Sequence, residues 1–271
     1  MKISFRERAH VELLWRCVRS CGSSREMERV RAYVESLCGI RALEAMHPMQ
    51  QPSHGFFPGL PTNPWYEPEE FPWTRKLVEE YDQIREEADR ATALAAHAPQ
   101  IGPLAEGTWN VLHLRVMGQP TAAGRLVCPK TSGFVTQLPG CGDAGMVYIS
   151  SLAPGTHVKA HCGASNTRLR CHLGLKVPPS CSIRVGDETR DWRECGVLVF
   201  DDSIDHEVWN RGTETRQVLI LDFWHPDLTP AERKALVRLS YIRKKERQLR
   251  RNTLQGADRV ARDARRLLAA V

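Results

Sequence analysis

The fold is decided by residues 168–224, which have the sequence RLRCHLGLKVPPSCSIRVGDETRDWRECGVLVFDDSIDHEVWNRGTETRQVLILDFW. This stretch contains five short runs of strand-forming residues, separated by Gly, Pro, Asn and Asp. Two more runs, WNVLHLRV at 109–116 and GMVYISSL at 145–152, extend the pattern towards the N-terminus. Seven such runs at close spacing, with no helical pattern between them, indicate an antiparallel β-sandwich or barrel. We predict that this domain covers residues 105–236.

The segments on either side of the strands have helical or Pro- and Gly-rich sequence patterns. Apolar positions recur at helical spacing in residues 4–47, so residues 1–50 predict a helical N-terminal extension. Residues 51–104 begin with a Pro- and Gly-rich stretch and end in a second helical pattern, which predicts an extended arm and a helix packed on the core. A Thr-Pro pair at 229–230 then predicts the start of a C-terminal helix that packs on the barrel and continues into a basic helical tail over 237–271.

Composition and charge exclude several classes of protein. With 42% hydrophobic and 26% charged residues in a chain of 271, a disordered or fibrous protein is excluded. The net charge of +6 comes from the C-terminus, because residues 231–271 hold 13 basic and 4 acidic residues while the remainder is mildly acidic. Without interleaved aromatic residues, this tail indicates a solvated basic helix, and we expect no nucleic-acid partner.

The cysteines and the N-terminus bear on the expected compartment. Nine cysteines with no CxxC pair argue against both a disulfide framework and a four-cysteine zinc site. The opening MKISFRERAHVELLW lacks the pattern of a secretory signal, and no apolar run approaches the ~20 residues of a membrane span. The sequence therefore predicts reduced thiols, no membrane span and a cytoplasmic location.

Two histidines and one arginine are the first candidates for chemistry. His161 and His206 each lie at the edge of a predicted strand, and Arg216 follows ten residues after the second histidine. In non-heme Fe(II) oxygenases two histidines and a carboxylate hold the metal on one side of a barrel. An arginine on a neighbouring strand suits the far carboxylate of 2-oxoglutarate, because its guanidinium binds carboxylates through two hydrogen bonds. A lone histidine is more often structural, so the hypothesis depends on all three residues together.

Alternation along the strands places further basic groups together. Side chains two residues apart point to the same face of a strand, so Arg168, Arg170 and His172 share a face. Facing inward, these three groups would repel one another unless anions lie between them. An arginine cluster that faces the solvent is the alternative.

The sequence around these residues resembles a known family. The stretches HVKAHCGASNTRLRCHLGLKVP, IRVGDETRDWRECGVLVFDDSIDHEVWN and RQVLILDFWHPDLTPAER closely resemble the aspartyl/asparaginyl β-hydroxylases, which are Fe(II)- and 2-oxoglutarate-dependent oxygenases. The resemblance is dense from about residue 146 to 236. It implies a mainly β fold, the double-stranded β-helix or jelly roll shared with cupins. The implied cofactors are Fe(II), 2-oxoglutarate as cosubstrate and O2.

The resemblance also implies a role for each site residue. His161 and His206 would be the iron ligands and thus catalytic. Ser150 and Arg216 would hold the distal carboxylate of 2-oxoglutarate, Arg170 and His172 would grip its metal-side carboxylate, and Trp109 would line the same pocket. Arg168 would meet an acidic substrate, unless it simply faces the solvent.

The usual carboxylate ligand is missing from this sequence. It belongs two residues after the first histidine, where Gly163 stands, and the resembling family shares this absence. Water would then fill the free metal position. Asp202, four residues before His206, is our candidate to accept a hydrogen bond from that water, which makes it a third catalytic residue. A turn aspartate that bonds its own backbone is an equal alternative.

Three functions follow from these residues. The first is hydroxylation at the β-carbon of an Asp or Asn residue, or of a related amino-acid-derived substrate, with conversion of 2-oxoglutarate to succinate and CO2. The second is halogenation, with a halide in the position left free by Gly163. The third is a cupin-like binding protein without catalysis. The expected partner is a peptide, protein or amino-acid-derived substrate, and the N-terminal helices are candidates for substrate recognition or for a homo-oligomer.

Overall fold

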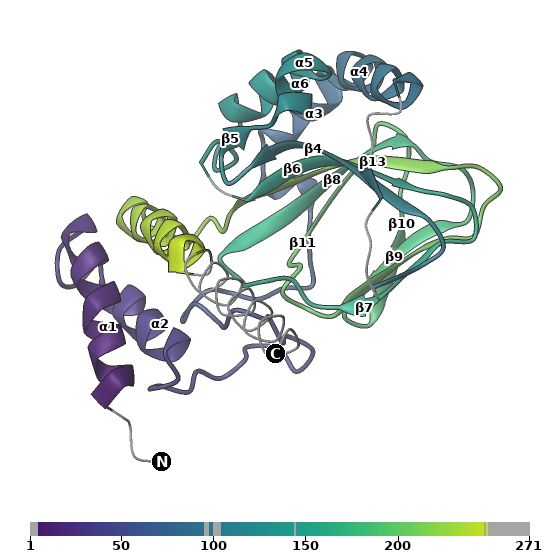
Figure 1. Ribbon diagram of the computed structural model, residues 1–271. Coiled ribbons are helices and arrows are strands. Elements are labelled where there is room, and N and C mark those ends of the chain that lie inside the picture. Colours follow the sequence, from purple (N-terminus) through teal and green to yellow (C-terminus); the bar gives the residue numbers. More distant parts are fainter. Residues whose placement is uncertain (1–4, 95–97, 100–103, 144, 247, 249–271) are drawn as a thin grey trace, which may run out of the picture. The chain divides into compact units, whose positions relative to one another are not determined.

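The computed structural model describes residues 5–94, 98–99, 104–143, 145–246 and 248. The chain divides into two compact units, one formed by residues 41–228 and the other by residues 1–40 together with 229–271. Both are drawn in Figure 1, and each is described here by itself. Within the described part of the chain, no helix combines the length and apolar character that crossing a membrane requires.

The unit made from the two chain ends is helical. It contains α1 (Phe5–Val18), η1 (Arg19–Cys21), α2 (Glu28–Leu37) and a helix over residues 230–246. Thr229 and Glu232 form reciprocal hydrogen bonds that cap this last helix, as the Thr-Pro pair predicts. Arg29 of α2 forms an ion pair with the same Glu232 at 2.7 Å. The C-terminal helix thus lies in the unit of the N-terminal helices, and the predicted boundary at 236 differs from the end of the strands at Trp224.

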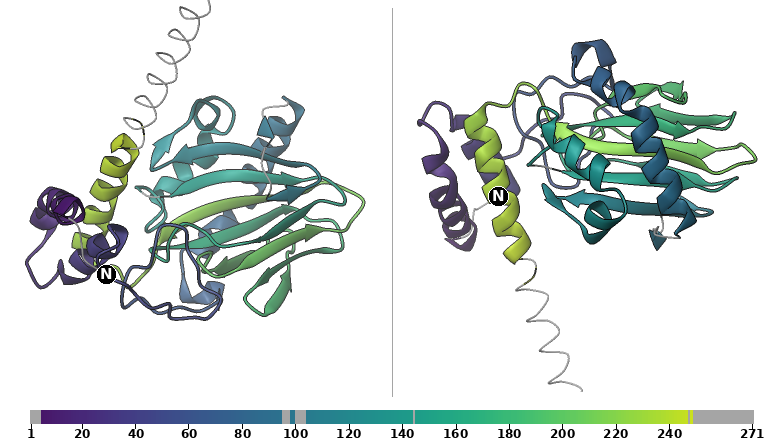
Figure 2. Two further views of the ribbon diagram at one scale, coloured as in Figure 1. Left: turned by 60° about the horizontal axis from the view of Figure 1, so that its bottom comes forward. Right: turned by 90° about the horizontal axis from the view of Figure 1, so that it is seen from above.

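The larger unit is built on two antiparallel sheets (Figure 2). The eight-stranded sheet has the order β1 (Trp65–Tyr66), β11 (Val197–Phe200), β8 (Arg168–Lys176), β13 (Arg216–Trp224), β6 (Met146–Leu152), β4 (Trp109–Val116) and β2 (Ala98–Pro99), with β5 (Gln119–Pro120) paired to β4. The five-stranded sheet has the order β10 (Glu188–Asp191), β9 (Cys181–Val185), β12 (His206–Asn210), β7 (His157–His161) and β3 (Ala105–Glu106). This arrangement confirms the predicted double-stranded β-helix.

Helices cover the outer face of the eight-stranded sheet (Figure 1). They are α3 (Thr74–Glu79), α4 (Tyr81–Ala93), α5 (Ala122–Leu126) and α6 (Pro129–Phe134), with the short turns η2 (Pro68–Glu70) and η3 (Val135–Gln137). Alternate residues of the same strand separate the two cores: Leu112 of β4 packs towards the helices, while Val111 belongs to the core between the sheets. The helical pattern predicted towards the end of residues 51–104 corresponds to two helices, α3 and α4, and residues 95–97 and 100–103 lie outside the described residues.

The arm over residues 48–64 contains no regular element beyond one isolated bridge at Gln50, in agreement with its Pro and Gly content. Its backbone binds both loops that flank the paired strands β7 and β12. Met49 O accepts a hydrogen bond from Asp205 N at 2.8 Å, just before β12. Phe57 exchanges two hydrogen bonds with the side chain of Asn166, in the loop after β7. The arm is therefore part of the framework around the histidine pair.

Candidate active site between the two sheets

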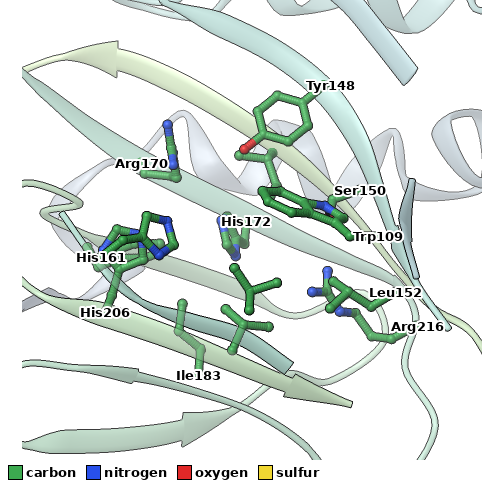
Figure 3. Close-up of a pocket in the computed structure, with 14 residues that line it drawn as sticks. Trp109, Tyr148, Ser150, Leu152, His161, Arg170, His172, Ile183, His206 and Arg216 are labelled. Carbon is green, nitrogen blue, oxygen red and sulfur yellow. Dashed lines mark hydrogen bonds between the residues drawn. The ribbon is translucent and has the colours of Figure 1, made fainter. Parts of the chain in front are cut away.

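A cavity opens between the inner faces of the two sheets (Figure 3). Its walls combine apolar side chains with imidazole, guanidinium, phenol, indole and hydroxyl groups. The lining residues are Trp109, Tyr148, Ser150, Leu152, Val158, His161, Arg170, His172, Ile183, Phe200, His206, Val208, Arg216 and Ile220. Most of the site residues expected from the sequence belong to this lining. The two exceptions are Asp202 and Arg168.

The two histidines face each other across neighbouring strands. His161 at the end of β7 pairs in register with His206 at the start of β12, and their ring centroids are 4.2 Å apart. Each Nδ1 lies within hydrogen-bond distance of a backbone carbonyl, that of Lys159 at 2.7 Å and that of Ile204 at 2.9 Å. Since a carbonyl only accepts, each Nδ1 carries the proton and each Nε2 keeps a lone pair for a metal.

The environment keeps His206 neutral. The ring of His206 is buried, and its pKa is held well below the ordinary range. Burial is the larger cause, and the nearby His161 is the second. A neutral imidazole is the form that binds a metal. Within the described residues no group of three or more His, Cys, Asp or Glu side chains is arranged to hold a metal. The imidazole pair therefore offers two protein ligands for a metal.

Arg216 lies inside the cavity with unused hydrogen-bond donors. The residue is 1% exposed, and its guanidinium carbon lies 4.6 Å from the ring centroid of Trp192. Its Nε and Nη1 atoms are buried, and no described residue accepts a hydrogen bond from them. Burial lowers the pKa of Arg216 to about 10, which still leaves it charged at neutral pH. A buried cation with free donors is a binding site for an anion.

Four neutral side chains lie in the same part of the site as this arginine: Trp109, Ser150, Trp192 and His172. The indole Nε1 of Trp109 donates to the hydroxyl of Ser150 at 3.1 Å. The indole of Trp192 stacks on His172 and donates to its Nδ1 at 3.2 Å. Because Nδ1 accepts, the proton of the neutral His172 ring is on Nε2, a buried donor that has no acceptor among the residues described. The cavity thus presents unused donors from Arg216 and from His172.

Arg170 is held between two carboxylates. Its Nη2 lies 3.0 Å from Asp202 Oδ2, and its Nε lies 3.0 Å from Asp222 Oδ1. Burial opposes the charge of Arg170, but the two aspartates raise its pKa well above the ordinary value. Arg170 therefore remains a cation that lines the cavity with one edge already occupied.

Asp202 reaches the site by another route than the one predicted. Asp202 lies in the turn between β11 and β12, whereas the prediction placed it on the same strand as His206. The alternation of side chains along a strand therefore does not apply to it. Its carboxylate nonetheless points to the site: a Cβ built on Gly163 would lie 2.4 Å from Asp202 Oδ2. Burial raises the pKa of Asp202, while Arg170 acts to lower it. The space beside Gly163, where a carboxylate ligand would stand, is filled by Asp202.

Arg168 and three further His and Cys residues lie at the edge of the site or outside it. Arg168 is half-buried and outside the cavity lining, although its charge acts on Asp202. His157 pairs with Glu207 at 3.0 Å, away from the cavity. His225 Nε2 lies 3.1 Å from the carbonyl of Pro61, a structural contact. Cys162, beside the first histidine, contacts the Met49 carbonyl through its sulfur.

Tyr148 and Asp222 are polar residues of the site that were not predicted. Tyr148 lines the cavity and lies two residues before Ser150 on β6, and Asp222 lies six residues after Arg216 on β13. Alternation places both on inward-facing positions, so the signal was in the sequence. Burial raises the pKa of the Tyr148 phenol, which stays protonated at neutral pH.

Fold and cavity together define a class: double-stranded β-helix proteins that carry a histidine pair and buried arginines between their sheets. The family model described as aspartyl/asparaginyl beta-hydroxylase matches residues 78–226, more than half of the chain. The chain therefore belongs to the aspartyl/asparaginyl β-hydroxylase family, a family of enzymes of the 2-oxoglutarate-dependent oxygenase type. The resemblance predicted from the sequence is confirmed.

Individual relatives are similar over the same region. The aspartyl/asparaginyl beta-hydroxylase of Homo sapiens is 38% identical over 190 residues, which cover 66% of this chain and 25% of the human protein. The human aspartate beta-hydroxylase domain-containing protein 2 is 32% identical over 210 residues, 72% of this chain and 56% of that protein. The ornithine lipid ester-linked acyl 2-hydroxylase of Rhizobium tropici is 32% identical over 179 residues, 62% of this chain and 63% of the relative. The chain spans about a quarter of the length of the first of these relatives.

Proposed function

We propose that the protein is an Fe(II)- and 2-oxoglutarate-dependent hydroxylase whose site lies between the two sheets. The observation that carries the proposal is Arg216, a buried guanidinium whose Nε and Nη1 have no acceptor among the described residues. It lies in the same cavity as two imidazoles with free Nε2 atoms. A dicarboxylate that spans from a metal to an arginine matches this arrangement.

The residues of the cavity fit the proposed groups. His161 and His206 would hold Fe(II), since imidazole suits iron and both rings have the required tautomer. Arg216 and Ser150 would bind the distal carboxylate of 2-oxoglutarate. His172 Nε2 and the free edge of Arg170 would donate to the carboxylate near the metal. With two carboxylate groups bound, the unused donors of the cavity acquire acceptors.

Iron, 2-oxoglutarate and O2 would together supply the oxidation of a substrate C–H bond to an alcohol, with release of succinate and CO2. The chain contributes position and charge. Arg216 neutralises the distal carboxylate, while the apolar walls from Leu152 and Ile183 exclude water from it. Asp202, fixed by Arg170 at 3.0 Å, would accept a hydrogen bond from water beside the metal.

Halogenation, the second candidate, would need a halide in the space beside Gly163. That space already contains the carboxylate of Asp202, since a Cβ on Gly163 would lie within 2.7 Å of both of its oxygens. An anionic neighbour disfavours a bound halide through charge repulsion. The third candidate, a binding protein without catalysis, does not account for the family match, because the family consists of enzymes of the 2-oxoglutarate-dependent oxygenase type. Hydroxylation is the better-supported reaction.

The substrate we propose is an Asp or Asn side chain in a peptide or protein, or a related amino-acid-derived molecule. The human relative is named for aspartyl and asparaginyl β-hydroxylation, and the Rhizobium tropici relative for 2-hydroxylation of an acyl chain on ornithine lipid. Arg168 lies near Asp202 at the edge of the site and suits an acidic group of the substrate.

Turnover of 2-oxoglutarate tests the proposal. The iron-loaded protein is incubated with a panel of Asp- and Asn-containing peptides and free amino acids, and succinate and product mass are measured with chloride present. We expect succinate and a product heavier by one oxygen atom. His206→Ala should abolish succinate formation because the metal loses one of its two protein ligands. Succinate formed by this variant at the wild-type rate would contradict the assignment, and a chlorinated product would favour halogenation.

A further inference from the structure

Asp222 is a buried carboxylate that the proposed chemistry does not use. It is 4% exposed and lies on β13, on the inward face beyond Ile220. Both of its oxygens are bound: Oδ1 accepts from Arg170 Nε at 3.0 Å, and Oδ2 accepts from the backbone N–H of Met146 at 2.9 Å. The two hydrogen bonds come from β8 and β6, the strands on either side of β13. The carboxylate therefore has one orientation in the sheet.

A glycine makes room for this carboxylate. Gly145 precedes β6 with a φ of +74°, a backbone conformation that favours glycine. A Cβ built on Gly145 would lie 2.3 Å from Asp222 Cβ and 2.8 Å from its Oδ2. Contacts this short would move the aspartate, so the absence of a side chain at 145 is a condition for its position.

The second aspartate completes a clamp on Arg170. Asp222 takes Nε and Asp202 takes Nη2, so the two carboxylates share one edge of the guanidinium and leave Nη1 for another acceptor. One cation between two anions would be a poor site for a third anion if charge alone decided. The arrangement makes sense if orientation is what the aspartates supply.

We propose that Asp222 is a positioning residue, which fixes the Arg170 guanidinium so that its free edge faces the metal-side carboxylate of 2-oxoglutarate. The inference rests on the proposed function, since it assigns a role within the same site. Charge and orientation predict opposite results for Asp222→Asn. Loss of a negative charge alone would tighten the binding of an anion, whereas loss of orientation would weaken it.

The test is calorimetric titration of 2-oxoglutarate into the full-length protein loaded with Mn(II), which is redox-stable in place of iron. We expect Asp222→Asn to weaken 2-oxoglutarate binding about tenfold, the lower end for outer partners of a metal site. The Mn(II) affinity should stay within about twofold of wild type, because neither histidine is touched. Asp222→Asn binding as tightly as wild type, or more tightly, overturns the inference.

Two further variants keep the result interpretable. Gly145→Ala retains the carboxylate and its charge but displaces it, so we expect it to weaken 2-oxoglutarate binding as well. Glu87→Gln is the matched control: Glu87 is also buried and also accepts from backbone N–H groups, those of Lys130 and Thr131, but it lies outside the cavity. It should leave binding unchanged, and an equal loss there would overturn the inference. No binding by wild type would overturn the proposed function itself.

Discussion

Arg216 carries its charge into the space between the sheets, where its Nε and Nη1 meet no acceptor among the described residues. Burial lowers its pKa to about 10, which reflects the cost of keeping the ion there. The packing of Trp192 against the guanidinium, at 4.6 Å, offsets part of that cost. The buried charge of Arg216 therefore destabilises the ligand-free protein. A bound carboxylate would pair with it and increase the stability.

Arg216→Met separates these two effects. Methionine fills a similar volume without charge, so we expect the ligand-free protein to become more stable by about 1 kcal/mol or more. At the same time 2-oxoglutarate binding should fall by at least about a hundredfold, because a buried charged hydrogen bond is lost. Thermal unfolding with and without 2-oxoglutarate measures both. A ligand-free variant less stable than wild type would show that Arg216 is paired in solution.

Whether the sequence predicts the place of a site residue depends on the secondary-structure element that carries it. Alternation holds along uninterrupted strands, so the inward positions of Arg170, His172 and Arg216 follow from the sequence alone. It fails at Asp202, because a turn precedes β12, and only the fold brings that carboxylate to Gly163. The grouping of the C-terminal helix with α1 and α2 depends on contacts between the two chain ends, which a local pattern does not encode.

The arm over residues 48–64 is the element that joins the two histidine loops, and Gln50 is its buried anchor. Its amide donates to Ser203 Oγ at 2.8 Å and accepts from Met46 N at 3.2 Å. Replacement of this residue, Gln50→Leu, should lower the free energy of unfolding by about 1–3 kcal/mol, since it leaves buried polar groups unpaired. We also expect faster release of the metal, because Ser203 lies in the turn before His206. Denaturant unfolding and chelator-driven metal release measure the two effects, with the exposed Gln51→Leu as the control. Unchanged release would separate the arm from the metal site.

At the scale of the whole molecule, all site residues fall in one of the two units. Every residue that lines the cavity, together with Asp202, Asp222 and the arm, lies within residues 41–228. The described residues of the helical unit contribute none of them. Recognition of the substrate or of a second copy stays a prediction for the N-terminal helices.

A fragment of residues 41–228 should therefore keep the chemistry of the site. We expect it to bind Mn(II) and 2-oxoglutarate within about threefold of the full chain, because both cores of the larger unit are retained. If the helical unit recognises the substrate, the fragment should lose substrate-stimulated succinate formation while cosubstrate binding persists. Calorimetry and succinate release, measured on the fragment and on the full chain, give the comparison.

A folded fragment that binds no 2-oxoglutarate would contradict the confinement of the site to the two sheets. Equal substrate-stimulated turnover would exclude the helices from substrate recognition and leave them as candidates for self-association, which sedimentation of both proteins would measure.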